Sequence, residues 1–169
     1  MKEIFEGKKI LISGHTGFKG SWLAFWLNSL GAKVTGLALD PISSPSCYEA
    51  LKLSNSIKDL RVDVRDSSKL ISVVKQEKPD FVFHLAAQSL VGPAYINPIY
   101  TWETNLLGTV NILEALRLVN KKCSAVIITS DKCYDNQEWV WGYKETDKLG
   151  GPDPYSASKG AAEFAVSSY

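Results

Sequence analysis

KILISGHTGFKG, residues 9–20, joins a short apolar run to three glycines that stand three residues apart. The run from Lys9 to Ser13 is typical of a buried β-strand, and the segment from Phe18 to Leu30 has the apolar spacing of a helix. Glycines between a strand and a helix allow a tight turn and let a ligand approach the backbone closely. The free N–H groups at the start of the helix then favour an anion such as a pyrophosphate. A glycine-rich turn without a ligand is the alternative interpretation.

The rest of the chain alternates between short runs rich in β-branched residues and longer helical segments. The expected strands cover residues 33–39, 58–62, 81–85 and 125–129, and the expected helices cover residues 66–76, 99–119 and 156–169. Strands that are apolar on both faces and joined by helices predict an α/β fold with a doubly wound parallel sheet. Such dinucleotide-binding sheets usually have about six or more strands. We therefore expect one Rossmann-like domain over residues 1–169 that is incomplete at its C-terminus.

Composition excludes several classes of protein. The chain has 169 residues, of which 45% are hydrophobic and 22% are charged, as in ordinary globular proteins. Its net charge of +1 gives no electrostatic reason to expect nucleic acid or an anionic membrane surface as a partner. No window approaches the ~20 apolar residues of a membrane span, so we expect a cytoplasmic protein. The spacing of Cys47, Cys123 and Cys133 indicates neither a disulfide framework nor a metal site.

Acidic and small residues follow the other predicted strands. Asp40 ends the second strand, where a carboxylate can accept hydrogen bonds from both adenosine ribose hydroxyls and repel a 2′-phosphate, which favours NAD over NADP. Asp63 follows the third strand, where an adenine edge would lie, and Ala86 and Ala87 close the fourth with small residues beside which a cofactor can lie. Structural alternatives remain open, because an aspartate can cap a turn and small residues can simply pack.

Tyr155 and Lys159 lie one helical turn apart in the last predicted helix. Side chains four residues apart share a helix face, so the ammonium would favour the phenolate over the phenol. Such a tyrosine can take a proton from a sugar or alcohol hydroxyl. The same spacing also occurs on an ordinary solvated helix face.

The fifth predicted strand ends in TSDKCY, residues 129–134. Three polar residues, Ser130, Asp131 and Lys132, then emerge at the carboxyl edge of a parallel sheet, which is where ligands bind in such folds. A surface turn rich in Ser and Asp is the alternative. The following residues, 136–151, are expected to form a loop over the site or an ordinary surface loop.

Together these motifs resemble the extended short-chain dehydrogenase/reductase family, and within it the nucleotide-sugar 4,6-dehydratase type. The motifs that carry the resemblance, in the family's order, are Gly14-x-x-Gly17-Phe18-x-Gly20, Asp63, Ala86-Ala87, Ser130 and Tyr155-x-x-x-Lys159. The run SDK at residues 130–132 resembles the dehydratases, whereas epimerases of the family usually lack this acid/base pair. The glycine-rich loop and residues 130–134 are most similar to members that act on CDP-glucose, although other sugar dehydratases also use Asp-Lys.

This resemblance implies a three-stage reaction with NAD as cofactor. Tyr155, assisted by Lys159 and hydrogen-bonded through Ser130, would take the C4 hydroxyl proton of the sugar while C4 delivers a hydride to NAD. Lys132, as a neutral amine, would then take the C5 proton, and Asp131 would protonate the departing C6 hydroxyl. Return of the hydride to C6 would give CDP-4-keto-6-deoxyglucose without net consumption of NAD.

The candidate site therefore has a catalytic and a cofactor-binding part, with no metal expected. The candidate catalytic residues are Ser130, Asp131, Lys132, Tyr155 and Lys159. The candidate cofactor-binding residues are Gly14, Thr16, Gly17, Phe18, Gly20, Asp40, Asp63, Val64, Ala86, Ala87, Gln88, Tyr155 and Lys159.

The resemblance also implies features outside the site. Family members carry a C-terminal lobe for the nucleotide-sugar that this chain lacks, and they dimerise through helices that correspond here to residues 99–119 and 154–169. We therefore expect a homodimer when the protein is full length. Two other functions stay open: a nucleotide-sugar 4-epimerase or reductase that uses Tyr155 without loss of water, and an inactive NAD-binding fragment.

Overall fold

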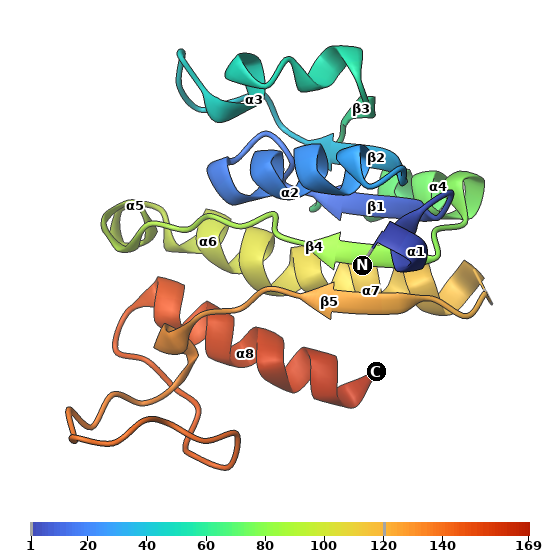
Figure 1. Cartoon of the computed structure of the whole chain (residues 1–169). Coiled ribbons are helices and arrows are strands. Elements are labelled where there is room, and N and C mark those ends of the chain that lie inside the picture. The colour runs from blue at the N-terminus through green and yellow to red at the C-terminus, as the bar shows by residue number, and fades with distance from the viewer. Residues whose placement is uncertain (1, 120) are drawn as a thin grey trace.

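The computed structural model describes residues 2–119 and 121–169. Its centre is one parallel sheet in the strand order β3-β2-β1-β4-β5 (Figure 1). The strands are β1 (Lys9–Ser13), β2 (Lys33–Ala38), β3 (Lys58–Arg61), β4 (Phe81–His84) and β5 (Ser124–Ile127). The order reverses between β1 and β4, and this is the point at which a doubly wound sheet opens a crevice at the carboxyl ends of its strands.

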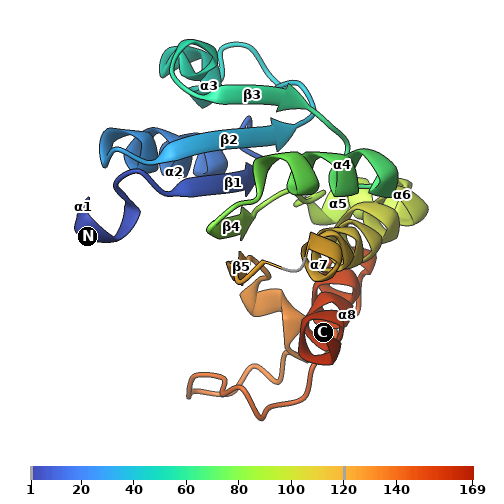
Figure 2. The ribbon, with the colours of Figure 1, turned by 90° about the vertical axis from the view of Figure 1, so that its right-hand side faces the viewer.

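Helices connect the strands and cover both faces of the sheet. They are α1 (Lys2–Phe5), α2 (Phe18–Ser29), α3 (Cys47–Ala50), α4 (Ser67–Glu77), α5 (Val91–Ile96), α6 (Pro98–Trp102), α7 (Gly108–Val119) and α8 (Pro154–Ser168). Three short turns are helical of other types: η1 (Leu53–Asn55) and η3 (Asp131–Cys133) are 3₁₀, and η2 (Glu103–Leu107) is π-helical. Figure 2 shows α2 on one side of the sheet and α4 and α7 on the other.

Two hydrophobic cores follow from the alternation of side chains along β1. Ile10 and Ile12 point to one face and pack with Leu27 of α2, whereas Leu11 points to the other face and packs with Leu70 of α4. All five side chains are almost completely buried. Because successive residues of a strand face opposite sides, an unbroken apolar strand is what a sheet with helices on both faces requires.

The predicted helix over residues 99–119 differs from the structure at its centre. The run from Pro98 to Val119 is helical but contains the π-helical turn η2. Within this turn, the side-chain amide of Asn105 bonds both backbone groups of Gln88, accepting from N–H at 2.8 Å and donating to C=O at 3.0 Å. Tertiary hydrogen bonds of this kind leave no mark on apolar periodicity. Helix α5 was not predicted either.

The connection from β2 to β3 also contains structure that the sequence analysis did not predict. Helix α3 begins with a capping box in which Ser46 and Glu49 bond each other's backbone N–H groups, and η1 follows it. Tyr48 of α3 and Leu53 of η1 are buried in the core on the α2 side.

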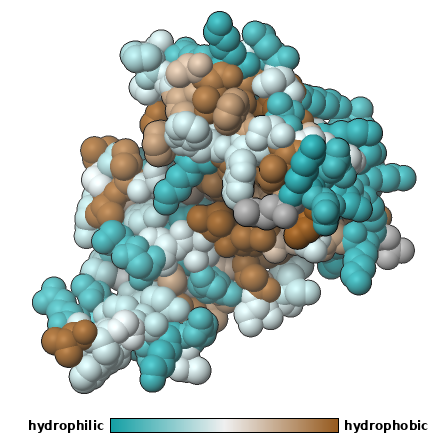
Figure 3. Space-filling view, in the orientation of Figure 1, coloured by the Kyte–Doolittle hydropathy of each residue, from teal (hydrophilic) through white to brown (hydrophobic). Residues whose placement is uncertain are grey.

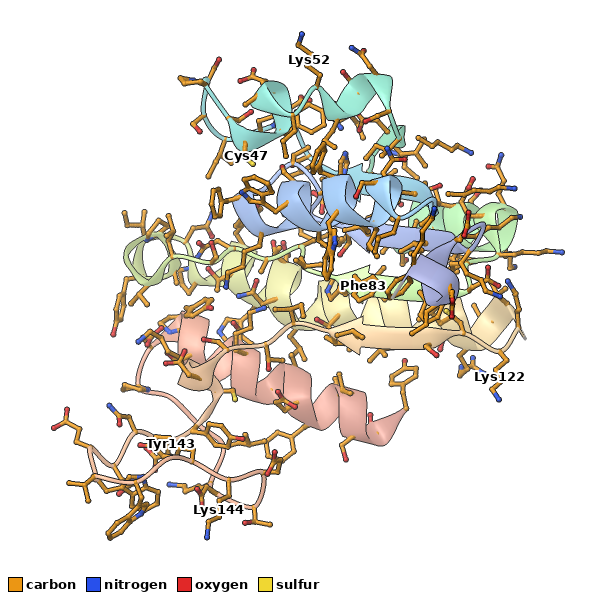
Figure 4. All side chains as sticks on the ribbon, viewed as in Figure 1. Cys47, Lys52, Phe83, Lys122, Tyr143 and Lys144 are labelled. Carbon is orange, nitrogen blue, oxygen red and sulfur yellow. The ribbon has the colours of Figure 1, made fainter. Side chains whose placement is uncertain are left out.

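The long loop between η3 and α8 holds a group of aromatic side chains. Tyr134 and Tyr143 stack with ring centroids 5.2 Å apart, and the Tyr143 hydroxyl accepts a hydrogen bond from the backbone N–H of Gln137 at 2.7 Å. Figure 4 shows Tyr143 within this loop, below α8. None of residues 136–151 lines the cleft at the carboxyl edge of the sheet. The structure therefore favours an ordinary surface loop over a loop that covers the site.

Several apolar side chains remain on the surface. Trp26 of α2 and Val126 of β5 are each nearly half exposed, and apolar side chains gather on the face shown in Figure 3. No helix in the described part of the chain is both long and apolar enough to cross a membrane. The three cysteines are free thiols; Cys133 is buried and the other two are partly buried.

Candidate active site

A cleft of about 590 Å³ lies at the carboxyl edge of the sheet. Its walls come from the β1–α2 loop, from the ends of the other four strands, from Tyr100 of α6 and Thr104 of η2, and from α8. Twelve of the thirteen candidate cofactor-binding residues line it: Gly14, Thr16, Gly17, Phe18, Gly20, Asp40, Asp63, Val64, Ala86, Ala87, Tyr155 and Lys159. The structure therefore brings together segments that are more than 100 residues apart in the chain.

The glycine-rich loop has a separate requirement at each glycine. Gly14 has φ of +77°, and a Cβ there would lie 2.7 Å from the backbone nitrogen of Ala86, so only glycine fits. A Cβ at Gly20 would overlap the carbonyl oxygen of Gly14. Gly17 differs, because a Cβ there would meet nothing closer than 3.4 Å. Gly14 and Gly20 are therefore required by the packing of the loop, whereas Gly17 leaves open space beside the cleft.

Helix α2 begins at this loop without a side-chain cap. Gly17 is the N-cap residue, and no side chain in the described part of the chain accepts a hydrogen bond from the first turn. The first turn comprises Phe18, Lys19 and Gly20, which all line the cleft. Uncapped N–H groups and the positive end of a helix dipole favour an anion at this point.

His15, the residue after Gly14, is fully buried beneath the loop. Its Nε2 lies 2.8 Å from Asp59 of β3, and its ring occupies the space that a Cβ at Gly36 would need. Burial lowers the pKa of His15, and Asp59 opposes this effect in part. The loop is thus fastened to β2 and β3 by a side chain that the sequence analysis did not single out.

Two aspartates at the ends of β2 and β3 are paired with arginines. Asp40, whose side chain is 86% exposed, accepts a hydrogen bond from Nε of Arg61 at 2.7 Å. Asp63 accepts from the guanidinium of Arg65, with the shortest distance 2.7 Å from Nη2, and this contact holds the pKa of Asp63 below its usual value. Both carboxylates are therefore acceptors paired with a guanidinium at the edge of the cleft.

A buried polar network joins the carboxyl ends of the neighbouring strands β1 and β4. The hydroxyl of Ser13 accepts hydrogen bonds from the backbone N–H groups of Leu85 and Ala86, and therefore donates to Nδ1 of His84 at 2.6 Å. Nε2 of His84 then donates to Thr109 of α7 at 3.2 Å. Burial, with the nearby positive charge of Lys159, lowers the pKa of His84 to about 3, so the ring is neutral. This network fixes the end of β4 against the loop.

Gln88 is the predicted cofactor residue that does not line the cleft. Its side-chain nitrogen donates to the carbonyl oxygen of Leu90 and to the hydroxyl of Thr101, and its backbone bonds Asn105. The next residue, Ser89, lines the cleft instead. Gln88 therefore stabilises the segment after β4 through these hydrogen bonds and does not contact the cleft.

Tyr155 and Lys159 share the cleft-facing side of α8. Asp153 caps this helix by accepting from the N–H of Ser156 at 3.0 Å, and Pro154 occupies its first turn. Nζ of Lys159 donates to the carbonyl oxygen of Ile128 at 3.0 Å, just beyond β5. Burial lowers the pKa of Lys159 to about 8, against the opposing charge of Glu163. The phenol hydroxyl of Tyr155 makes no hydrogen bond to another side chain in the described residues.

Ser130, Asp131 and Lys132 lie at the carboxyl edge of β5 but outside the lining of the cleft. Ser130 caps η3, accepting from the N–H of Lys132 at 3.2 Å and donating to Asp131 at 3.0 Å. Both Asp131 and Lys132 are exposed. Among the described residues, no hydrogen bond joins Ser130 to Tyr155, whereas the preceding Thr129 lines the cleft.

The strand order, the glycine-rich turn at the switch point and the uncapped helix behind it define a Rossmann-type domain of the dinucleotide-binding class. The family model described as GDP-mannose 4,6 dehydratase matches residues 11–169. The chain belongs to this family. The resemblance to extended short-chain dehydrogenases of the nucleotide-sugar 4,6-dehydratase type is thereby confirmed.

Individual relatives cover nearly all of this chain. A CDP-glucose 4,6-dehydratase of Salmonella typhimurium is 49% identical over 168 residues, which are 99% of this chain and 47% of that protein. A CDP-paratose 2-epimerase of Salmonella typhi is 30% identical, over 95% of this chain and 52% of its own length. This chain thus spans about half the length of the curated relatives it matches.

Solved structures share the same fold. An epimerase of Methanothermobacter thermautotrophicus superposes with a TM-score of 0.83 at 29% identity, over 98% of this chain and 48% of its own. The UDP-glucose 4-epimerase of Thermus thermophilus, solved in complex with NAD, gives 0.81 at 29% identity, over 95% and 50%. The predicted α/β, doubly wound parallel fold is confirmed.

Proposed function

We propose that this chain is the cofactor-binding half of an NAD-dependent lyase that converts CDP-glucose to CDP-4-keto-6-deoxyglucose and water. The observation that carries the proposal is the meeting of the glycine-rich loop and the Tyr155–Lys159 pair in one cleft. The relative that is 49% identical is a CDP-glucose 4,6-dehydratase, which supports CDP-glucose as the substrate. Residues outside this chain complete the site for the nucleotide-sugar under this proposal.

The cleft fits NAD by the chemistry of its walls. The pyrophosphate would lie on the first turn of α2, beside Gly17, where N–H groups have no side-chain cap. Asp40 would accept from the adenosine ribose, and Asp63 with Val64 would border the adenine. Ala86 and Ala87, with no long side chain, would lie along the middle of the cofactor. NAD, when bound, supplies hydride acceptance from C4 and hydride return to C6 of the sugar.

Each catalytic side chain has a distinct proposed task. Tyr155 takes the C4 hydroxyl proton, and the ammonium of Lys159, one turn along α8, favours the phenolate. The backbone hydrogen bond from Lys159 to Ile128 orients that ammonium from the β5 side. The charged form of Lys159 dominates below its pKa of about 8, so this support is present at neutral pH.

We assign the elimination step to η3. Lys132 removes the C5 proton and Asp131 donates a proton to the departing C6 hydroxyl, which leaves as water; C5 takes up a proton exchanged with solvent as the hydride returns to C6. Their exposure at the carboxyl edge of β5, next to the cleft-lining Thr129, supports contact with a substrate that enters from solvent. Ser130, which caps this turn, is proposed to hydrogen-bond the phenol once substrate is bound.

The experiment uses the complete protein, with the residues that finish the nucleotide-sugar site, and follows solvent deuterium into C5 of CDP-glucose with added NAD, for the wild type, Lys132→Met and Lys144→Met. Lys144 is the matched control because it is an exposed lysine on the adjacent loop. We expect deuterium at C5 and a 4-keto-6-deoxy product with the wild type and the control, and loss of both with Lys132→Met. Undiminished exchange in Lys132→Met would exclude this lysine as the base. Oxidation or epimerisation at C4 without loss of water would favour the epimerase instead, and NAD binding by the complete protein without turnover would favour an inactive NAD-binding protein.

A homodimer and a cytoplasmic location complete the proposal. Large apolar side chains remain exposed along α6 to α8, among them Ile99, Leu107 and Phe164, each more than half exposed, and burying such a surface favours association. Three free cysteines suit a reducing compartment.

A further inference from the structure

Arg61 places a positive charge next to the carboxylate that is proposed to bind the adenosine ribose. Its Nε donates to Asp40 at 2.7 Å, and its two terminal nitrogens donate to Asp59 and, at 3.2 Å, to the hydroxyl of Tyr48. The side chain of Arg61 is 36% exposed. The guanidinium is thus held on one side by the protein interior and faces Asp40 and solvent on the other.

The position of this guanidinium does not depend on Asp40 alone. Asp59 also lies 2.8 Å from Nε2 of the buried His15 and accepts from Tyr48, and the Arg61 guanidinium stands 5.3 Å from the centre of the Tyr48 ring. Hydrogen bonds from Tyr48, His15 and Arg61 outweigh the effect of burial and hold the pKa of Asp59 below its usual value. Loss of the Asp40 carboxylate would leave these contacts of Arg61 intact.

The two side chains prefer opposite ligands at the same place. A carboxylate accepts hydrogen bonds from the two ribose hydroxyls and repels a 2′-phosphate, whereas an arginine at this position accommodates that phosphate. A guanidinium matches phosphate geometry with parallel N–H donors. With Asp40 present, the Nε donor is occupied and the guanidinium faces two carboxylates, Asp40 and Asp59.

We propose that Arg61 is a specificity-determining residue of the cofactor site: Asp40 occupies it and sets the preference for NAD, and loss of that carboxylate turns Arg61 into a receptor for the 2′-phosphate of NADP. This inference rests on the proposed dinucleotide site. It adds that the choice between NAD and NADP at that site depends on the ion pair of Asp40 with Arg61.

The experiment measures binding of NAD and NADP by calorimetry to the 169-residue chain. The variants are Asp40→Asn, Arg61→Met and the double variant, with Arg117→Met as the control because Arg117 is an exposed arginine of α7 that pairs with Glu114 and not with Asp40. We expect Asp40→Asn to bind NADP at least about tenfold more tightly than the wild type does and NAD more weakly. The double variant should lose the gain for NADP. Arg61→Met alone should bind NADP more weakly than the wild type does, since the guanidinium no longer opposes the charge of Asp40.

Absence of a gain for NADP in Asp40→Asn, or a gain kept in the double variant, would overturn the inference while leaving the NAD site intact. A wild-type chain that binds neither dinucleotide would overturn the proposed cofactor and this inference together. Thermal unfolding of every variant checks that the fold is kept. If the double variant unfolds, Asp40→Asn with Arg61→Gln replaces it and must meet the same requirement.

Discussion

Lys159 is the residue at which burial and chemistry oppose each other most directly. It is 6% exposed and donates to a backbone carbonyl, and its charged form is disfavoured by the loss of water. The same ammonium is proposed to support the phenolate of Tyr155. A stability cost at a functional residue is common in active sites.

This cost predicts a pH dependence with a definite sign. The pKa of Lys159 is about 8 in the folded state and about 10.5 when unfolded, so between these values the unfolded chain binds more protons and stability rises with pH. Relative to Lys159→Met, the free energy of unfolding of the wild type should rise by about 3 kcal/mol from pH 8 to 10.5. Urea unfolding of both proteins across this range checks it. A constant difference would show that the folded lysine titrates normally.

At the residue scale, the sequence predicted the residues at motif positions. It did not predict the buried side chains that stabilise the loop and the strand ends around them. Gly14, Asp40 and Tyr155 follow rules of spacing and therefore could be predicted. His15 and His84 could not, because each acts through a partner distant in the chain, Asp59 or Ser13. The one available signal was a histidine in an otherwise apolar run, as in FVFHL at residues 81–85.

At the scale of elements, the β1–α2 loop separates glycines needed for folding from a glycine needed for the ligand. Gly17 has φ of −75°, and the methyl group added by Gly17→Ala meets nothing closer than 3.4 Å. Stability should change by less than about 1 kcal/mol, because the reduced entropy of the unfolded chain and the poorer N-cap preference of alanine oppose each other. Affinity for NAD should fall at least about tenfold, because the methyl group enters the space proposed for the pyrophosphate.

Gly20→Ala is the matched control for this change. Its methyl group overlaps the backbone of Gly14, so the fold itself should be destabilised, by roughly 2 kcal/mol or more. Thermal unfolding and NAD calorimetry on both variants separate the two effects. Equal loss of stability in both variants would show that Gly17 also serves the fold.

The strands matched the sequence analysis best, and all five were predicted with ends within two residues. β1, β2 and β4 carry apolar runs that face the two cores, whereas the edge strands β3 and β5 are mostly exposed or half-buried. The π-helical turn was not predicted because it accompanies a tertiary contact, the hydrogen bonds of Asn105 with the backbone of Gln88. The sequence also did not predict how the turn η3 is oriented. It located residues 130–132 at the correct edge of the sheet, but it did not show that they lie outside the lining of the cleft.

For the whole molecule, the apolar surface of α6 to α8 predicts self-association. Phe164 of α8 is 64% exposed, and a charge in its place would be buried in the proposed interface. We expect a dimer for the wild type and a monomer for Phe164→Asp in sedimentation velocity. Val140→Asp is the control, since Val140 is 95% exposed on the loop between η3 and α8, outside the helices of the proposed interface, and should leave the dimer unchanged. A wild type that remains monomeric at high concentration would refute the interface.

The central claim for the molecule is that NAD lies across the carboxyl edge of the sheet with its nicotinamide facing Tyr155. A crystal structure of the chain with NAD tests this most directly. We expect the pyrophosphate on the first turn of α2, the adenosine ribose at Asp40 and the nicotinamide ring in contact with the phenol. A nicotinamide ring bound elsewhere, or a Tyr155 hydroxyl turned away from it, would contradict the account.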